Sequence, residues 1–127
     1  MNKTIIYSDK APSPIGSYSQ GIMVGNTLFI SGQIAFDPAT GELITNDISD
    51  ETDQVMKNLW AILNAAGMDF SHVVKCSIFV KDMGYFETIN TIYGKYFHEN
   101  PPARETVEVS GLPKNVNVEI SCIAVKE

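Results

Sequence analysis

Residues 50–67, DETDQVMKNLWAILNAAG, contain the pattern that decides the fold. Acidic residues crowd the first turn, where the helix macrodipole favours negative charge, and apolar residues then recur at three- and four-residue spacing. Gly67 follows at the position where a left-handed residue commonly ends a helix. The stretch therefore predicts one amphipathic helix over residues 50–66. Trp60 lies in this run, and its simplest interpretation is a core anchor.

The segments around this helix alternate or run apolar in the manner of strands, and a second amphipathic pattern follows. The expected strands are residues 3–7, 21–24, 27–31, 72–80, 103–109 and 116–125, with the second helix over residues 85–97. The order is β-β-β-α-β-α-β-β. Because strands far outweigh two helices, we expect an α+β fold in which one six-stranded mixed sheet has both helices packed on one face.

Length and composition predict a single globular domain over residues 1–127. Hydrophobic residues make up 44% of the chain and charged residues 19%, and the formal net charge is −6. Nucleic-acid binding needs lysine and arginine to neutralise phosphates, and the chain has no basic run, so the composition argues against a nucleic-acid partner. No apolar stretch approaches the ~20 residues that cross a bilayer, and the N-terminus lacks the apolar core of a signal peptide. We expect a cytoplasmic protein without membrane attachment.

The last predicted strand indicates what its sheet faces. One side carries Val116, Val118, Ile120, Cys122 and Ala124, and the other carries Asn117, Glu119, Ser121, Ile123 and Val125. The second side is half polar and half apolar, a composition suited to subunit contact around an enclosed polar site. Symmetric self-association is therefore a reasonable hypothesis.

Metal and phosphate chemistry find little support. The two cysteines and two histidines, at positions 76, 122, 72 and 98, show no metal-ligand spacing, and no glycine-rich phosphate motif is present. The cysteines lie in apolar runs and are expected to be buried free thiols. A cysteine–histidine nucleophile pair stays open on spacing alone, although buried cysteine is usually inert. We expect neither a metal nor a cofactor.

Arg104 is the only arginine of the chain, and it opens a predicted strand just after Pro101-Pro102. A guanidinium is planar and always charged, and its rigid fork matches a carboxylate bidentately. The position invites the question of which anion it binds. The simpler alternative is a surface strand residue paired with Glu105 or Glu108.

Three further polar residues are candidates for chemistry: Tyr18 in the first loop, Ser31 at a predicted strand end, and Glu119 in the last strand. Glu119 stands among apolar residues, where a lone buried carboxylate is costly and needs a partner. The simpler alternative for Glu119 is an ion pair with Lys114 or Lys126, or exposure to water.

Taken together, these residues lie within a set of short motifs that resembles a known family, the RidA/YjgF (YjgF/YER/UK) imine deaminases. The motifs occur in order over essentially the whole chain, and their joint occurrence is specific although each is weak. They are residues 11–12, 15–21, 29–34, 80–83, 86, 88–90, 93, 102–104, 107–109, 112–114, 118–120 and 124–125.

The resemblance implies a chorismate-mutase-like homotrimer whose active sites lie between adjacent subunits. It implies hydrolysis of reactive enamines and imines, namely 2-aminoacrylate with its tautomer 2-iminopropanoate, and 2-iminobutanoate. These are released by pyridoxal-phosphate-dependent serine and threonine dehydratases, and the products are a 2-keto acid and ammonia. Some members of the family carry the older labels endoribonuclease L-PSP or translation inhibitor.

The resemblance also implies roles for individual residues. Arg104 matches the arginine that binds the substrate carboxylate, and Glu119 matches the glutamate that positions or activates water. Tyr18 and Ser31 match hydroxyl residues near the substrate. The remaining predicted substrate-binding positions are Gly32, Asn90 and Thr106. Thr106 departs from the family pattern, because many relatives have cysteine there.

Two other functions remain as alternatives. An endoribonuclease needs a basic track for phosphates and usually a histidine pair. The net charge of −6 argues against the first, and the ordinary strand and helix-end settings of the two histidines argue against the second. A non-catalytic trimer that binds small 2-keto acids in the same cleft would retain Arg104 but could dispense with Glu119. Binding and turnover measured on Glu119 variants distinguish this second alternative from an enzyme.

Overall fold

Helix α1 spans Ile48–Ala65, so it begins two residues before the predicted start and ends one residue before the predicted end. Asp47 caps it, because its side chain accepts a hydrogen bond from the Asp50 amide at 2.8 Å. Gly67 follows in the left-handed conformation with a φ of +73°, as predicted. The computed structural model describes residues 1–127, and neither of its α-helices is both long and apolar enough to cross a bilayer.

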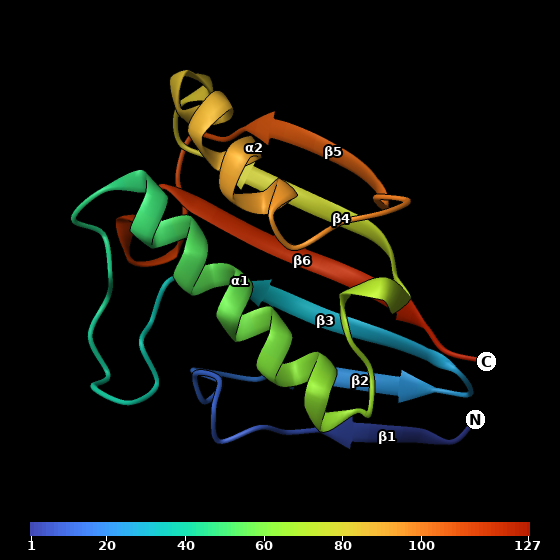
Figure 1. Ribbon diagram of the computed structural model, residues 1–127. Helices are drawn as coiled ribbons and strands as arrows, with labels where there is room; N and C mark the ends of the chain where they lie inside the picture. The colour runs from blue at the N-terminus through green and yellow to red at the C-terminus, as the bar shows by residue number, and fades with distance from the viewer.

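The sheet has six strands in the order β1-β2-β3-β6-β4-β5. The strands are β1 (Lys3–Ile6), β2 (Gly21–Val24), β3 (Thr27–Gln33), β4 (Val73–Val80), β5 (Ala103–Glu108) and β6 (Val118–Val125). Only the β4–β5 pair is parallel, so the sheet is mixed as predicted. Figure 1 shows α1 and the second helix, α2 (Phe86–Gly94), on the same face of this sheet. The α+β prediction is therefore confirmed, with β5 as one edge strand.

Three further boundaries differ from the predictions by two or three residues, and in two of them turns take up the residues at the end of the element. Helix α2 stops at Gly94, three residues early. Strand β6 starts at Val118 because a short 3₁₀ helix, Pro113–Asn115, precedes it. Strand β3 runs on to Gln33, so residues predicted to follow the strand lie inside it.

Trp60 is not the core anchor that the helix pattern predicted, because 45% of its surface is exposed. The buried stripe of α1 contains Val55, Leu59 and Ile62. With 3.6 residues per turn, position 60 lies about 100° around the helix axis from Leu59, at the flank of that stripe. The prediction was wrong because it assigned Trp60 to the buried stripe, which Val55, Leu59 and Ile62 form without it.

The core lies between the helices and the sheet and contains both cysteines. Cys76 of β4 and Cys122 of β6 are register partners, and both are buried free thiols, as predicted. The opposite face carries an apolar row across four neighbouring strands. This row consists of Ile5, Ile22, Phe29 and Ile123, which are register partners in sequence along the sheet. Ile5 and Phe29 are exposed, so the face without helices is left uncovered within the chain.

Glu51 joins the start of α1 to the start of β6. Its buried carboxylate accepts hydrogen bonds from the backbone and side-chain amides of Asn117, both at 2.8 Å. The Val118 amide is a third donor at 3.3 Å. A buried carboxylate needs such donors to offset its lost hydration, and here they fix the chain two residues before Glu119. The sequence pattern assigned Glu51 only to the helix dipole.

Candidate active site

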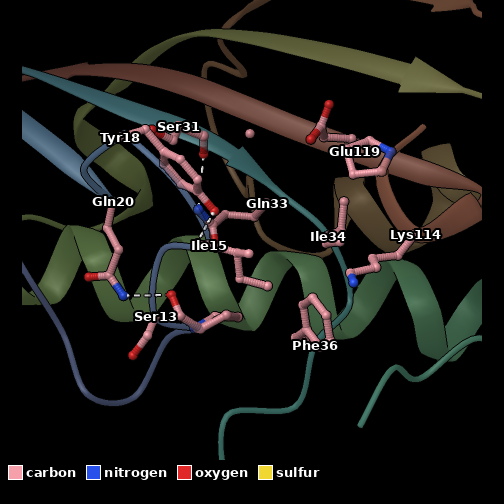
Figure 2. Close-up of a pocket in the computed structure, with 13 residues that line it drawn as sticks. Ser13, Ile15, Tyr18, Gln20, Ser31, Gln33, Ile34, Phe36, Lys114 and Glu119 are labelled. Atoms are coloured by element: carbon pink, nitrogen blue, oxygen red, sulfur yellow. Dashed lines mark hydrogen bonds between the residues drawn. The ribbon is translucent and has the colours of Figure 1, made fainter. Parts of the chain in front are cut away.

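A cavity of about 460 Å³ lies between the first long loop, the end of β3 and the start of β6. Four of the seven predicted site residues line it: Tyr18, Ser31, Gly32 and Glu119. Figure 2 shows the side chains of Tyr18, Ser31 and Glu119 around this cavity, with Ile15, Ile34 and Phe36 as apolar neighbours. The volume is within the range of small-molecule sites. The structure thus brings together residues that are up to a hundred positions apart in sequence.

Gln20 holds the loop that forms one wall of this cavity. Its buried side-chain amide donates to the carbonyl oxygens of Pro12 at 2.8 Å and Ser8 at 3.0 Å. Its amide oxygen accepts from the Ser8 backbone at 2.7 Å. The Gln20 carbonyl in turn accepts from the Ser31 amide at 2.9 Å, which ties the loop to β3. Gln20 belongs to one of the sequence motifs, but no sequence pattern indicated that its side chain holds this loop in place.

Ser31 and Tyr18 present hydroxyl groups from adjoining segments. The Ser31 hydroxyl donates to the Ser19 carbonyl at 2.5 Å, so its oxygen remains able to accept a hydrogen bond. The Tyr18 hydroxyl accepts from the Ile15 amide at 3.2 Å, which leaves its proton free to be donated. Both groups are therefore available to a polar ligand.

Ser31 was predicted at a strand end, but Ser31 and Gly32 form an irregularity inside β3. The β3–β6 register shifts between Ile30 and Gln33, so the two residues bulge out of regular pairing. A Cβ atom at Gly32 would lie 2.8 Å from the Glu119 Cδ atom. Glycine at position 32 therefore leaves the space that the Glu119 carboxyl group occupies.

Glu119 has no cationic partner in the chain, so the ion-pair alternative is wrong for both Lys114 and Lys126, and Glu119 is partly rather than fully exposed to water. None of the three ion pairs includes it, and Lys126 donates to the Gly67 carbonyl at 2.8 Å instead. Burial raises the pKa of Glu119 above its ordinary value. A partly buried carboxyl group with a raised pKa is suited to exchange a proton with water or a substrate.

Arg104 lies in a second cluster, built on the edge strand β5 and helix α2. Its Nη1 atom donates to the Asn90 Oδ1 atom at 2.7 Å. The guanidinium carbon is 5.5 Å from the ring centroid of Phe86 and 5.1 Å from that of Tyr93. These are cation–π distances, and the two rings were predicted only as part of an apolar helix face.

The predicted acidic partners of Arg104 are engaged elsewhere. Glu105 pairs with Lys75 at 3.0 Å and accepts from the Ser77 hydroxyl, contacts that hold its pKa below the ordinary value. Glu108 accepts from the Met83 amide at 2.8 Å. The alternative that Arg104 is a surface residue paired with one of these glutamates is therefore wrong. Its guanidinium is left without any carboxylate in the chain.

Thr106 belongs to the Arg104 cluster by position. It follows two residues later on β5, so it lies on the same face of the strand. Its hydroxyl oxygen is buried and has no hydrogen-bond partner in the chain. A buried hydroxyl without a partner is uncommon in folded proteins.

One chain does not bring the two clusters together. Arg104 is the register partner of Cys76, whose side chain is in the core beneath the helices, whereas Glu119 is the partner of Phe79. Successive side chains of a strand point to opposite faces, and Phe79 lies an odd number of positions from Cys76. Arg104 and Glu119 therefore lie on opposite faces of the sheet, with β4 between their strands.

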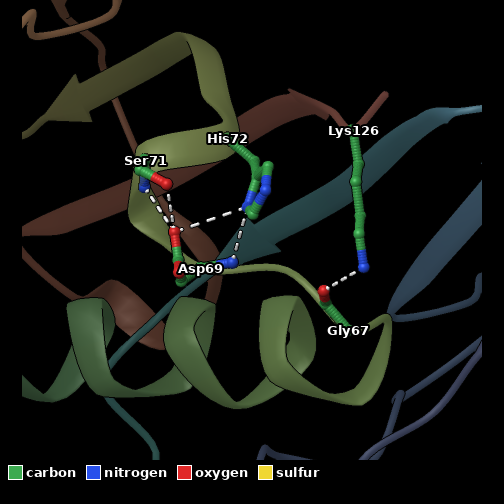
Figure 3. Close-up of polar contacts among 5 residues, drawn as sticks. All are labelled: Gly67, Asp69, Ser71, His72 and Lys126. Atoms are coloured by element: carbon green, nitrogen blue, oxygen red, sulfur yellow. Dashed lines mark hydrogen bonds and ion pairs between the residues drawn. The ribbon is translucent and has the colours of Figure 1, made fainter.

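The histidines have no part in either cluster. Figure 3 shows His72 in the connection between α1 and β4, where its Nδ1 atom accepts from the Asp69 amide at 3.0 Å. Asp69 in turn accepts from the Ser71 hydroxyl and the Ser71 amide, an arrangement that caps a short 3₁₀ helix and lowers the pKa of Asp69. His98 lies beyond α2 on the exposed surface. No group of three or more histidine, cysteine or acidic side chains is placed to hold a metal ion.

Comparison with known proteins matches residues 8–126 to the model of the Endoribonuclease L-PSP family. A RutC family protein of Pyrococcus horikoshii is 52% identical over 98% of this chain and 99% of its own. The human 2-iminobutanoate/2-iminopropanoate deaminase is 43% identical over 98% of this chain and 90% of its own. The crystal structure of TdcF from E. coli with bound serine has a TM-score of 0.94 and 39% identity, and covers 98% of this chain and 99% of TdcF.

Proposed function

This chain belongs to the Endoribonuclease L-PSP family, the YjgF/RidA proteins, and from this premise we propose that it hydrolyses small 2-imino acids to 2-keto acids and ammonia. The substrates are 2-iminopropanoate, the tautomer of 2-aminoacrylate, and 2-iminobutanoate. The observation that carries the proposal is the only guanidinium of the chain, which is held in place yet has no carboxylate to bind. Such a group is suited to the carboxylate of a small ligand.

Three of the relatives support the choice of substrate class. The human and rat relatives, 43% and 44% identical, are named as 2-iminobutanoate/2-iminopropanoate deaminases. The solved structure of TdcF holds serine, which is itself a small molecule with a carboxylate next to an amino-bearing carbon. A 2-imino acid has the same carboxylate and nitrogen arrangement.

The chemistry needs no covalent nucleophile, because the imine carbon is already electrophilic. Arg104 binds the carboxylate and so fixes the C=N carbon. Glu119 takes a proton from water as the water oxygen adds to that carbon, which gives a carbinolamine. That proton goes to the nitrogen and completes the neutral carbinolamine. Glu119 then moves the hydroxyl proton of the carbinolamine to the nitrogen as the C–N bond breaks, so that ammonia and the 2-keto acid leave. Tyr18 and Ser31 hydrogen-bond the reacting groups within the cavity.

A homotrimer completes the site in this proposal. The cavity with Glu119 on one subunit faces the edge strand of the next, which supplies Arg104, Asn90 and Thr106. The separation of the two clusters within one chain supports this arrangement. The exposed apolar row beginning at Ile5 supports it too, because such a surface is stabilised by burial against another subunit.

A coupled assay tests the proposed function. A serine or threonine dehydratase releases the imine, and the release of keto acid is followed with and without catalytic amounts of this protein. We expect faster keto-acid release, proportional to the protein added, because uncatalysed imine hydrolysis is the baseline. A rate equal to that of the dehydratase alone would contradict the proposal. The same preparation incubated with RNA is expected to leave it intact.

A further inference from the structure

We propose that helix α2 is a positioning element for Arg104, in which Asn90 fixes one edge of the guanidinium and the rings of Phe86 and Tyr93 fix its plane. The proposal rests on the proposed function in one respect, since it takes Arg104 as the group that binds the substrate carboxylate. It assigns Asn90 a role through Arg104 and gives Phe86 and Tyr93 a role beyond packing.

The three partners form one stripe on the helix. Phe86, Asn90 and Tyr93 are spaced four and three residues apart, so their side chains lie above one another on a single face of α2. That face meets the Arg104 side chain as it leaves β5. The polar residue contacts the guanidinium edge at 2.7 Å, and the aromatic residues flank it at cation–π distances of 5.5 and 5.1 Å.

This arrangement orients the cation without neutralising it. Asn90 is a neutral acceptor, whereas a carboxylate at that position would pair with Arg104 and compete with a substrate. A guanidinium has five N–H donors, and only the one on Nη1 is used within the chain. The other donors remain available, and a carboxylate can bind two of them in the bidentate mode.

Positioning matters because Arg104 is on an edge strand and its residue is exposed. A long side chain there would otherwise sample many rotamers, and a ligand would have to order it on binding. Contacts with α2 order the side chain in advance. The contacts from Phe86, Asn90 and Tyr93 should therefore strengthen ligand binding and lower KM. They should have little effect on kcat, because they stabilise the bound substrate and the transition state to the same extent.

The sequence allows a direct test, because a protein labelled with ¹⁵N-arginine gives NMR signals from Arg104 alone. We expect slow rotation about the Nε–Cζ bond in the wild-type protein and faster rotation in Phe86→Leu and Asn90→Ala. Phe86→Tyr keeps an aromatic ring at this position and is expected to retain slow rotation. Thr91→Ala, on the exposed side of the same helix, is the matched control and leaves it unchanged. Tyr93 is left intact because it is buried in the core.

Binding of 2-oxobutanoate, measured by calorimetry, connects the positioning to the ligand. Phe86→Leu and Asn90→Ala are expected to weaken binding and raise KM roughly five- to tenfold, with kcat within about twofold. In an Arg104→Lys background the same changes should have little effect, because a lysine has no planar group to hold.

Two results would overturn the proposal. One is an unchanged rate of Arg104 rotation in both Phe86→Leu and Asn90→Ala, and the other is that these changes weaken 2-oxobutanoate binding equally in the Arg104→Lys background. A wild-type protein that neither binds 2-oxobutanoate nor speeds imine hydrolysis would instead refute the proposed function. The rotation measurement decides the positioning role in that case too.

Discussion

Arg104→Ala is expected to abolish imine hydrolysis while leaving the fold intact. Truncating one partner of a desolvated charged pair costs about 2–5 kcal/mol, which corresponds to roughly 30- to several-thousand-fold in binding. The fold should tolerate the change, because Arg104 lies on an edge strand, is exposed and forms no ion pair. The measurement is kcat/KM in the coupled assay, together with the thermal unfolding midpoint.

Lys57→Ala is a suitable control, since Lys57 is an exposed cation on α1, paired only with Asp53. It removes the same charge at a position outside both clusters and should retain full activity. Clearance of dehydratase-derived imine at the wild-type rate by Arg104→Ala would show that the arginine is not the carboxylate-binding group.

Glu119→Gln is expected to lower kcat about 10²- to 10⁴-fold, the usual contribution of a general acid or base. Glutamine keeps the shape of the side chain but cannot take a proton from water. Binding of 2-oxobutanoate should stay within about twofold, since the carboxylate of the ligand is held by Arg104. Lost turnover with retained binding also separates an enzyme from a non-catalytic keto-acid-binding protein.

The same variant should not destabilise the protein. Burial raises the pKa of Glu119, so the folded state disfavours the charged form relative to the unfolded chain. The stability associated with the protonated group is present at low pH and is lost as pH rises through the raised pKa. At neutral pH the neutral glutamine amide removes the desolvation cost of the buried carboxylate. We therefore expect the unfolding midpoint of Glu119→Gln to equal or exceed that of the wild-type protein. Glu87→Gln, at an exposed position on α2, controls for the change in net charge.

The order and type of the elements could be predicted because each segment carries its own periodicity. The helix over residues 50–66 and the alternation along residues 116–125 are local patterns, and both are present in the structure within two residues at each end. Trp60 shows the limit of such patterns. Periodicity identifies a face but does not tell how wide the buried part of that face is.

The residues suggested four polar candidates, and the resemblance supplied their roles and a site between subunits, but neither could predict that Arg104 and Glu119 lie on opposite faces of the sheet. Which face a strand residue occupies depends on register, and register between β4, β5 and β6 is set by pairing across distant segments. The contacts of Arg104 could not be predicted either, because they depend on how distant segments pack together. Phe86 and Tyr93 belong to an apolar helix face in sequence, and only the packing of α2 beside β5 gives them a cation to contact.

The central claim is that one deaminase site is built from two copies of this chain, and mixed assemblies test it most directly. Arg104→Ala and Glu119→Gln are co-expressed with different affinity tags, and assemblies that contain both are isolated by purification on each tag in turn. Each parent alone should be inactive. The mixed trimers should recover roughly a third of wild-type activity, because a closed ring of three then has one interface where an intact cavity faces an intact arginine. Mixed assemblies as inactive as their parents would contradict the shared site.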